Sequence, residues 1–298
     1  MAIKPPILFL VFNRPQLTKK VFSEIRRFKP KKLFISADGP RSGNSQDRIL
    51  CKRVRKITEK VDWPCEVKRL YRDGNLGCKN SISKALSWFF ENENEGIILE
   101  DDCLPDTTFF QFCGEMLEKY RHNKDVGIIS GDNFIKGSTI EDSYYFSNYF
   151  HMWGWATWKR SWKSYDLTMR KWPKLNKDKW LEQLFIDKNE ANYWKTIFNR
   201  VYKEKVDTWD YQWIYSSWLN NSLSIVPNIN LVKNIGLGDV GTHVTGSVKY
   251  KVNKHKIVFP LKHPTHIERN IYLDKLESDY FYNKKSSVLR KILGIFSV

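Results

Sequence analysis

Short apolar runs alternate with helically spaced apolar residues over the first 130 residues of the chain. Between the runs, apolar side chains recur every three or four residues, as in Leu17, Val21 and Ile25. The runs have the length of buried strands, and the segments between them have the spacing of amphipathic helices. The alternation therefore predicts an α/β fold with a mostly parallel, doubly wound sheet. The predicted strands lie at 7–12, 33–37, 67–71, 97–99 and 126–130.

The fourth apolar run ends in three adjacent carboxylates, Glu100, Asp101 and Asp102. Open α/β sheets hold their ligands beyond the carboxyl ends of such strands. Three adjacent acids raise one another's pKa unless a hard divalent cation neutralises them, and such a cation can clamp a diphosphate. We therefore expect a Mn²⁺ or Mg²⁺ site here. The simpler alternative is a charged strand-to-helix turn with Asp102 near the helix start.

Three further polar segments follow predicted strands. Arg14 follows the first strand, where an arginine can hold a diphosphate or nucleoside as a bidentate donor, and Asp38 follows the second, where a carboxylate beside Gly39 can approach a base or ribose. The glycine-containing segment 72–77 precedes a helix predicted to begin near Lys79, where backbone N–H groups approach phosphate. A solvent-facing arginine and ordinary turns remain alternatives.

A second glycine-rich segment, 236–246, carries Thr242 and His243. Its glycines predict a loop that closes over a diphosphate, with His243 as a metal or phosphate ligand. A lone histidine in a loop is also common as a structural or solvent-facing residue.

Composition limits the class of protein without choosing its partner. The chain has 298 residues, 41% of them hydrophobic and 28% charged, which is ordinary for a globular protein. A net charge of +17 indicates an anionic partner: nucleic acid, an acidic membrane or a phosphorylated substrate. Five cysteines without a C-x-x-C pair indicate neither a disulfide framework nor a zinc site. We therefore expect a cytoplasmic protein, with no signal peptide or transmembrane helix.

The regular alternation fades after residue 130. Ten of the twelve tryptophans fall between Trp153 and Trp218, which suggests a pocket wall or an irregular core. We expect one domain over 1–247, with a nucleotide-binding half at 1–130 and an acceptor-binding half at 131–247, followed by a basic C-terminal extension at 248–298. The end of that extension has the pattern of a basic amphipathic helix on an anionic membrane, or of a helix docked on the domain; its cations are Lys284, Lys285, Arg290 and Lys291.

The order and spacing of these segments resemble the nucleotide-sugar glycosyltransferases of the GT-A fold, and most closely the N-glycan N-acetylglucosaminyltransferase family. The most specific match is Glu100-Asp101-Asp102-Cys103-Leu104-Pro105-Asp106 with Phe109-Phe110. The resemblance implies that Asp102 coordinates manganese and that Glu100 and Asp101 contact ribose or donor sugar. It also implies that Arg14 binds the nucleotide and that Asp38 contacts uracil.

The second half carries weaker matches to the same family. Ser130-Gly131-Asp132-Asn133 resembles a strand end, and Gly241-Thr242-His243 resembles the loop that closes on bound donor. Met152-Trp153-Gly154-Trp155 is similar to the acceptor segment, and Trp209-Asp210 to the motif that bears the catalytic base. The resemblance thus implies Asp210 as general base and Trp153, Trp155 and Trp209 as acceptor contacts. Tyr211 and Ala156-Thr157-Trp158 depart from the family pattern.

The resemblance implies a metal-dependent inverting glycosyltransferase. The expected donor is a UDP-sugar, with N-acetylglucosamine as the sugar moved, and the expected acceptor is a glycan or lipid-linked molecule of bacterial surface polysaccharide synthesis, at the inner face of the cell membrane. The first alternative is a sugar-phosphate nucleotidyltransferase, which shares the strand-end acids and the metal but needs a phosphate acceptor. The second is a non-catalytic nucleic-acid-binding protein, which the acids at the site disfavour, so we expect no nucleic acid partner.

Overall fold

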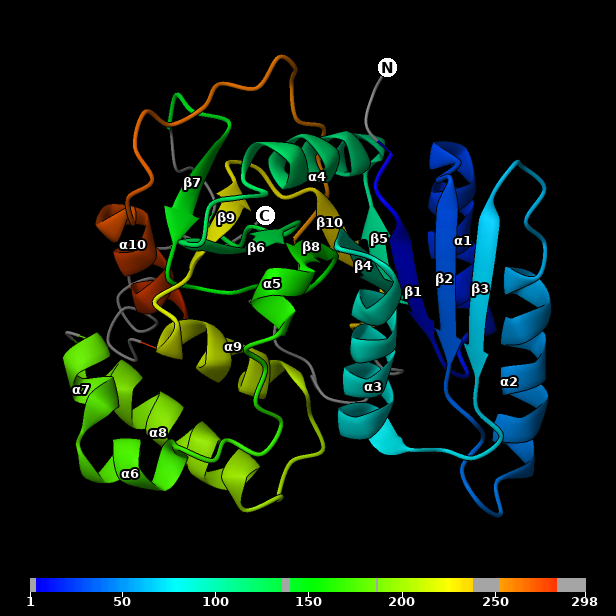
Figure 1. Cartoon of the computed structure of the whole chain (residues 1–298), viewed down its shortest axis with the longest axis horizontal. Helices are drawn as coiled ribbons and strands as arrows, with labels where there is room; N and C mark the ends of the chain where they lie inside the picture. The colour runs from blue at the N-terminus through cyan, green and yellow to red at the C-terminus, as the bar shows by residue number, and fades with distance from the viewer. Residues whose placement is uncertain (1–3, 136–139, 186, 238–251, 283–298) are drawn as a thin grey trace, which may run out of the picture.

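The molecule is built around one large mixed sheet (Figure 1). The computed structural model of the chain describes residues 4–135, 140–185, 187–237 and 252–282. Eight strands form the sheet in the order β3-β2-β1-β4-β8-β6-β9-β7, and β7 and β8 run opposite to the other six. This is a Rossmann-like α/β fold with a mostly parallel sheet, as the alternation of patterns predicts. Several families of nucleotide-binding enzymes share such a sheet, so it shows the class of fold and no family.

The described elements follow one another in a β-α alternation that becomes helix-rich after β8. The strands of the large sheet are β1 (Ile7–Val11), β2 (Lys32–Ala37), β3 (Glu66–Tyr71), β4 (Glu95–Glu100), β6 (Val126–Ser130), β7 (Tyr144–Ser147), β8 (Trp155–Trp158) and β9 (Leu223–Pro227). A small antiparallel pair joins β5 (Cys103–Pro105) to β10 (Val232–Asn234). The helices are α1 (Pro15–Phe28), α2 (Ser45–Thr58), α3 (Gly77–Asn92), α4 (Thr107–Lys119), α5 (Lys159–Trp162), α6 (Trp172–Lys177), α7 (Trp180–Leu184), α8 (Lys188–Tyr202), α9 (Asp210–Leu219) and α10 (Ile271–Phe281).

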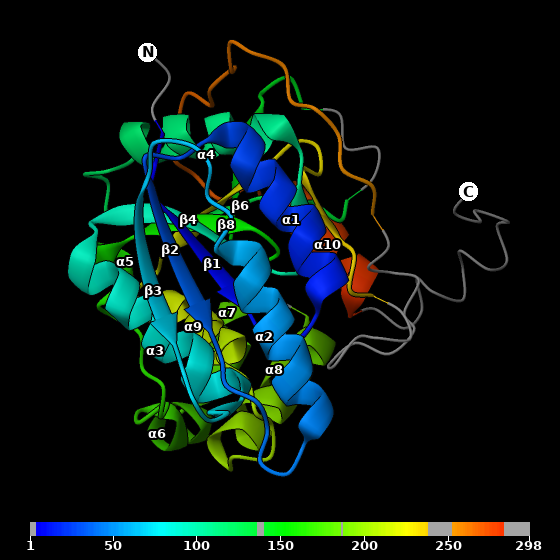
Figure 2. The ribbon, with the colours of Figure 1, turned by 90° about the vertical axis from the view of Figure 1, so that its right-hand side faces the viewer.

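Helices cover both faces of the sheet. The strands β1 and β4 lie at its centre, and the β4 residues Ile97, Ile98 and Leu99 are fully buried. Helices α1, α2 and α4 contribute to the hydrophobic core on one face, whereas α3, α8 and α9 contribute to the core on the other. Figure 2 shows α1 and α2 on one side of the first three strands and α3 on the opposite side. Burial on both faces explains why these strands read as continuous apolar runs.

The five predicted strands are confirmed, as β1, β2, β3, β4 and β6. The alternation does fade after residue 130, but the second half is more regular than this suggests, because β7, β8 and β9 extend the sheet. Strand β8 has only four residues, all buried, and it pairs with β4 and β6 in the interior of the sheet. Its sequence, Trp155-Ala156-Thr157-Trp158, therefore lacks the polar and apolar alternation by which a half-buried strand is recognised.

The turn interpretation of the acid triplet is also wrong in one respect. Asp102 does not begin a helix, since β5 separates it from α4. The helix is capped by Asp106, whose Oδ1 accepts a hydrogen bond of 2.9 Å from the backbone N–H of Thr108. This cap fixes the start of α4 without using any carboxylate of the triplet.

Most of the clustered tryptophans are core residues. Eight of the ten between Trp153 and Trp218 are buried, and Trp153 and Trp180 are the partly exposed ones. Seven of the buried ones belong to the core between the sheet and the helices of the second half, and Trp158 belongs to the core on the opposite face.

The described part of the C-terminal extension packs on the body of the domain. Leu273 of α10 contacts Tyr145 of β7 and Val226 of β9, and Asp274 accepts a hydrogen bond of 2.6 Å from the Ser147 hydroxyl. The basic residues predicted to bind a membrane, from Lys284 onward, lie outside the described residues. Within the described ranges, no helix combines the length and the apolar character needed to cross a bilayer.

Candidate active site

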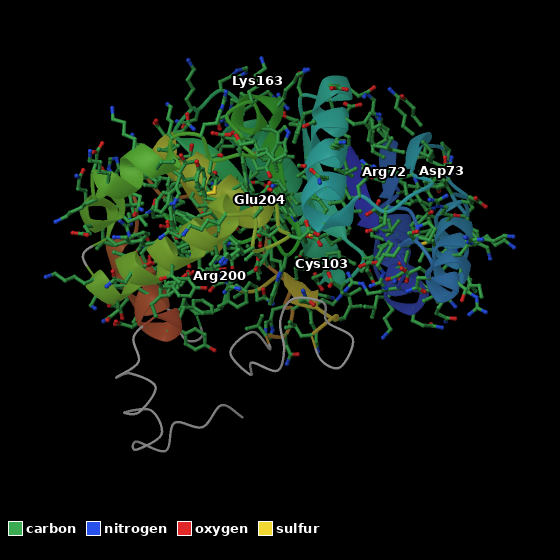
Figure 3. All side chains as sticks on the ribbon, turned by 90° about the horizontal axis from the view of Figure 1, so that it is seen from below. Arg72, Asp73, Cys103, Lys163, Arg200 and Glu204 are labelled. Carbon is green, nitrogen blue, oxygen red and sulfur yellow. The ribbon has the colours of Figure 1, made fainter. Side chains whose placement is uncertain are left out.

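A deep cleft opens at the carboxyl ends of the parallel strands. Its volume is about 1140 Å³, and its walls include residues that follow β1, β2, β4 and β6 together with residues of α8, α9 and α10. Figure 3 views the molecule from below, with Cys103, which follows the acid triplet, between Arg200 of α8 and Arg72, which follows β3. Pockets for drug-sized ligands measure about 300–1,000 Å³, so this cleft has room for a nucleotide and a second substrate.

Arg14 and the acid triplet form the floor of the cleft. The guanidinium of Arg14 donates from Nη1 to Asp102 Oδ2 at 2.9 Å and from Nη2 to Asp101 Oδ1. The residue precedes α1, whose Pro15 fixes the helix start, and β1 pairs directly with β4. The sheet order therefore brings together Arg14, Glu100, Asp101 and Asp102, as the sequence predicts.

Burial and mutual repulsion dominate the electrostatics of the triplet. Burial and the charge of Asp102 raise the pKa of Glu100 to about 8, although Arg14 opposes the shift. Burial also raises the pKa of Asp101 to about 6, again against the charge of Arg14. One arginine is therefore too little positive charge for three carboxylates, and a ligand that binds here must supply more.

The walls of the cleft are acidic although the chain is strongly basic. Among the described residues that line it, eight are acidic and three are arginines. The acids are Asp38, Glu100, Asp101, Asp102, Asp132, Asp207, Asp210 and Glu277; the arginines are Arg14, Arg41 and Arg200. An anionic substrate can bind among so many carboxylates only if cations come with it.

The donor set of the triplet fits a hard divalent cation with few protein ligands. Asp101 Oδ2 is buried without a hydrogen-bond partner among the described residues, and Asp102 is partly exposed to the cleft. Within the described ranges, no three His, Cys, Asp or Glu side chains converge as a complete metal site requires. Mg²⁺ is usually held by one or two carboxylates, waters and substrate phosphates. This donor set thus suits a cation that arrives with a nucleotide.

Asp38 holds two loops together at the edge of the cleft. Its carboxylate accepts hydrogen bonds from the N–H of Leu76 at 3.1 and 3.2 Å and from the Asn75 side chain at 3.0 Å. Burial raises the pKa of Asp38, while the N–H groups of Leu76 and Gly39 oppose the shift. A Cβ at Gly39 would lie 2.4 Å from the backbone of Gly74, so only glycine lets these loops approach. A nucleotide contact by Asp38 stays a prediction.

The N-terminus of α3 is occupied by a carboxylate of the second half. Asp207 accepts hydrogen bonds of 2.9 Å from the backbone N–H groups of Cys78 and Lys79. The Lys79 ammonium lies 2.9 Å from Glu204. Lys79 is therefore paired with protein groups and is absent from the described cleft lining. Its predicted nucleotide contact requires these pairs to open.

Asp210 lies at the first residue of α9 and lines the cleft. Its Oδ1 accepts hydrogen bonds from the Thr208 hydroxyl and, at 2.8 Å, from the backbone N–H of Tyr211. These are the contacts of a helix-terminal carboxylate. Its charge nevertheless contributes to the raised pKa of Glu100, so the two carboxylates share one electrostatic environment.

The predicted aromatic contacts divide between cleft and core. Trp153 and Trp209 line the cleft, whereas Trp155 is fully buried and stacks on Trp209 with ring centroids 5.7 Å apart. Trp155 thus belongs to the core. Thr242 and His243 lie outside the described residues.

Several residues that line the cleft are absent from the predicted site, and three of them form a cluster. Asp132 follows β6, His151 precedes β8, and Glu277 lies on α10. His151 and Glu277 are 126 positions apart with no motif around either. A signal existed only for Asp132, which ends an apolar run as the acid triplet does.

No protein-family model matches the chain, and no curated protein matches it. Solved structures do show similarity. The inositol-1-phosphate CTP transferase from T. maritima has 11% identity and a TM-score of 0.39, over 76% of this chain and 86% of that chain. The 4-diphosphocytidyl-2C-methyl-D-erythritol synthase from Anaerococcus prevotii DSM 20548 has 12% identity and a TM-score of 0.35, over 53% and 72%. A UDP-glucose pyrophosphorylase complexed with UDP-glucose has 12% identity and a TM-score of 0.30, over 53% and 70%.

These comparisons contradict the glycosyltransferase prediction. The proteins named are nucleotidyltransferases, and none is a glycosyltransferase. The resemblance to the N-acetylglucosaminyltransferase family is corrected accordingly. So are the expected transfer from a UDP-sugar, the glycan or lipid-linked acceptor and the membrane partner. At identities near 10% and TM-scores below 0.5 the matches assign no activity, and the function is argued below from the site itself.

Proposed function

We propose that the chain is a metal-dependent sugar-phosphate nucleotidyltransferase, which joins a nucleoside triphosphate to a sugar phosphate and releases pyrophosphate. The observation that carries the proposal is the juxtaposition of Arg14 with three carboxylates on the floor of an acidic cleft of about 1140 Å³. These carboxylates require a divalent cation to neutralise their charge, and a polyphosphate that binds together with its cation supplies one. The volume accommodates the second substrate beside the nucleotide.

The reaction needs positioning and charge stabilisation more than proton transfer. An oxygen of the acceptor phosphate attacks the α-phosphorus of the triphosphate, the bond from that phosphorus to the bridging oxygen breaks, and pyrophosphate leaves with the electron pair. A phosphate monoester has its second pKa near 6, so at pH 7 the acceptor is already anionic and no general base is required. This agrees with the hydrogen bonds that hold Asp210 as a helix-terminal residue.

Arg14 and the strand-end acids have separate tasks in this proposal. When bound, a Mn²⁺ or Mg²⁺ ion would neutralise charge on the triphosphate and on the leaving pyrophosphate. Asp102 would hold it, with Glu100 and Asp210 nearby. Arg14 uses two of its five N–H donors on Asp101 and Asp102, which leaves three for phosphate oxygens. Asp101 orients the guanidinium from a buried position.

We assign the nucleotide to the half at 1–130 and the second substrate to the half at 131–247. Asp38 lines the nucleotide side of the cleft, and Trp153 and Trp209 line the other side. Thr242 and His243 are retained as candidate phosphate or metal contacts only on the glycine-rich pattern around them.

Pyrophosphate release tests the proposal. The protein is incubated with Mn²⁺ or Mg²⁺, each nucleoside triphosphate in turn and a panel of hexose and inositol 1-phosphates. We expect one pair of substrates to release pyrophosphate, and Asp102→Asn to lower the rate by about 100-fold or more. The matched control is Asp106→Asn, since Asp106 is equally an aspartate near β5 but caps α4 outside the cleft. Failure of every pair to release pyrophosphate would refute the proposal.

A further inference from the structure

A second polar cluster lies on the cleft wall, two strands away from the acid triplet. Asp132 follows β6, which runs parallel to β4 with β8 between them. Adjacent strands lie 4.7–4.9 Å apart, so the ends of β4 and β6 are separated by about 10 Å along the same edge of the sheet. A substrate that reaches from the triplet to Asp132 therefore has a second part beyond its phosphate.

Asp132 has an unsatisfied oxygen at this position. The residue is 1% exposed, it lines the cleft, and its Oδ1 is buried with no hydrogen-bond partner among the described residues. Leaving a buried carboxylate oxygen unpaired is costly, and a bound ligand that donates a hydrogen bond removes that cost.

His151 and Glu277 set the charge around Asp132. His151 Nε2 lies 2.7 Å from Glu277 Oε1. Burial lowers the pKa of His151, but the charges of Glu277 and Asp132 more than offset this and raise it to about 9. The histidine is therefore a cation at neutral pH. Burial raises the pKa of Asp132 to about 7, although the charge of His151 opposes the shift.

The cluster disfavours an anion and requires a hydrogen-bond donor. Asp132 and Glu277 repel a second phosphate, whereas the unpaired Oδ1 of Asp132 accepts a hydrogen bond. A hydroxyl group donates that bond without bringing a charge into a buried position, which an amine would do. Aromatic rings provide the remaining wall, since Phe134 packs against both His151 and Trp153, with ring centroids 4.9 and 5.1 Å apart. Pockets with aromatic walls and a few polar groups suit the C–H faces and hydroxyls of sugars.

We propose that Asp132 binds a hydroxyl group of the sugar or cyclic polyol part of the second substrate, and that Trp153 packs against its C–H face. His151 is a positioning residue, and its contact with Glu277 holds a positive charge near Asp132. The subsite rests on the proposed function for the phosphate that this substrate carries, but its binding chemistry is measured separately from turnover.

Equilibrium binding tests the subsite. Glucose, galactose, mannose and inositol 1-phosphates are titrated by calorimetry into the protein with Mg²⁺ present, with inorganic phosphate as the control for the phosphate group alone. We expect one sugar or polyol phosphate to bind more tightly than inorganic phosphate. Asp132→Asn should weaken that binding by about 10- to 100-fold and leave the affinity for inorganic phosphate and nucleoside triphosphate unchanged. Asp106→Asn is again the matched control.

Deoxy analogues identify the hydroxyl. One monodeoxy analogue of the tightest ligand should bind the unmutated protein about 10- to 100-fold more weakly than the parent ligand does. Asp132→Asn should bind the analogue and the parent ligand with equal affinity. Trp153→Ala should also weaken sugar binding, and it carries the test if Asp132→Asn does not fold. Equal binding to the unmutated protein and to Asp132→Asn, or no sugar phosphate binding better than inorganic phosphate, would overturn the subsite.

The two proposals fail in different ways. Sugar binding that depends on Asp132 without any pyrophosphate release would refute nucleotidyl transfer and leave the subsite standing. Pyrophosphate release with an unchanged acceptor KM in Asp132→Asn would refute the subsite alone.

Discussion

The backbone of Gly236 lies directly against the carboxylate of Asp102. A Cβ atom at Gly236 would lie 2.4 Å from Asp102 Oδ2, and the N–H of the neighbouring Ile235 donates a hydrogen bond of 2.8 Å to the Asp102 carbonyl. The segment after β10 therefore fixes the acid that we assign to the cation, although the two residues are more than 130 positions apart.

Gly236→Ala should disturb that acid selectively. The added methyl group must displace either the short Asp102 side chain or the backbone of Gly236, so we expect cation-dependent nucleotide binding to fall by about 10-fold or more. Overpacking of this kind also costs about 1–3 kcal/mol of stability. Gly74→Ala is the control, because a Cβ at Gly74 meets nothing within 4 Å. If Gly236→Ala and Gly74→Ala bind nucleotide with equal affinity in the presence of the cation, the contact between Gly236 and Asp102 does not position this acid.

Asp207 should act as a long-range cap of α3. Its carboxylate binds the N–H groups of Cys78 and Lys79, and the loss of a helix cap costs about 1 kcal/mol. We therefore expect Asp207→Ala to lower the free energy of unfolding by about 1 kcal/mol, and Asp207→Asn to lower it less because the amide oxygen still accepts. Urea unfolding measures both, and an unchanged midpoint for Asp207→Ala would show that the contact adds no stability.

His151 should make stability depend on pH. Its pKa is raised from 6.5 to about 9 in the folded state, so its contribution is fully present below pH 6.5 and is lost as the pH rises through about 9. The contribution is on the order of 3 kcal/mol, at 1.36 kcal/mol for each pKa unit. The difference in unfolding free energy between the unmutated protein and His151→Gln should therefore shrink from pH 6 to pH 9.5.

The exposed His266 provides the control for this measurement. His266→Gln should give no such difference at any pH in the series. A difference for His151→Gln that stays constant across the series would rule out the ion pair with Glu277 as its source.

The two tryptophans of the Met152-Trp153-Gly154-Trp155 segment should separate stability from binding. Trp155 is fully buried and packs against Trp209 and Trp213, so Trp155→Ala should cost about 3–5 kcal/mol of stability. Trp153 is partly exposed at the cleft, so Trp153→Ala should cost much less and should lower ligand affinity instead. Thermal unfolding with and without nucleotide and sugar phosphate distinguishes the two. Equal losses of stability for Trp155→Ala and Trp153→Ala would contradict the assignment of Trp155 to the core and of Trp153 to the cleft.

The sequence predicts the first half well because β1, β2 and β4 are buried on both faces and read as continuous apolar runs. The apolar runs that end at Phe12, Ala37 and Leu99 leave Arg14, Asp38 and the acid triplet on one sheet edge, and the parallel order of the strands makes them neighbours. The position of these residues along the chain was enough to group them.

The second half was harder to predict because its site residues come together only through packing. Asp132, His151 and Glu277 meet when α10 packs against β7, and no local sequence pattern predicts that contact. The tryptophans gave an ambiguous signal, because side chains suited to stack on a sugar are equally suited to fill a core. The motif similarity to glycosyltransferases rested in large part on strand-end acids and an arginine, which any enzyme that binds a metal-nucleotide complex can place at this edge.

The position of bond cleavage in a nucleotide sugar distinguishes nucleotidyl transfer from glycosyl transfer. Nucleotide sugars labelled with ³²P in the β-phosphate are incubated with the protein, pyrophosphate and Mn²⁺ or Mg²⁺, and the labelled product is identified by chromatography. Nucleotidyl transfer run in reverse breaks the bond from the α-phosphorus to the oxygen that bridges the two phosphorus atoms. We therefore expect label in sugar 1-phosphate, with formation of nucleoside triphosphate. Label found in nucleoside diphosphate, with free sugar released, would mean that the sugar bond breaks, and it would contradict the account.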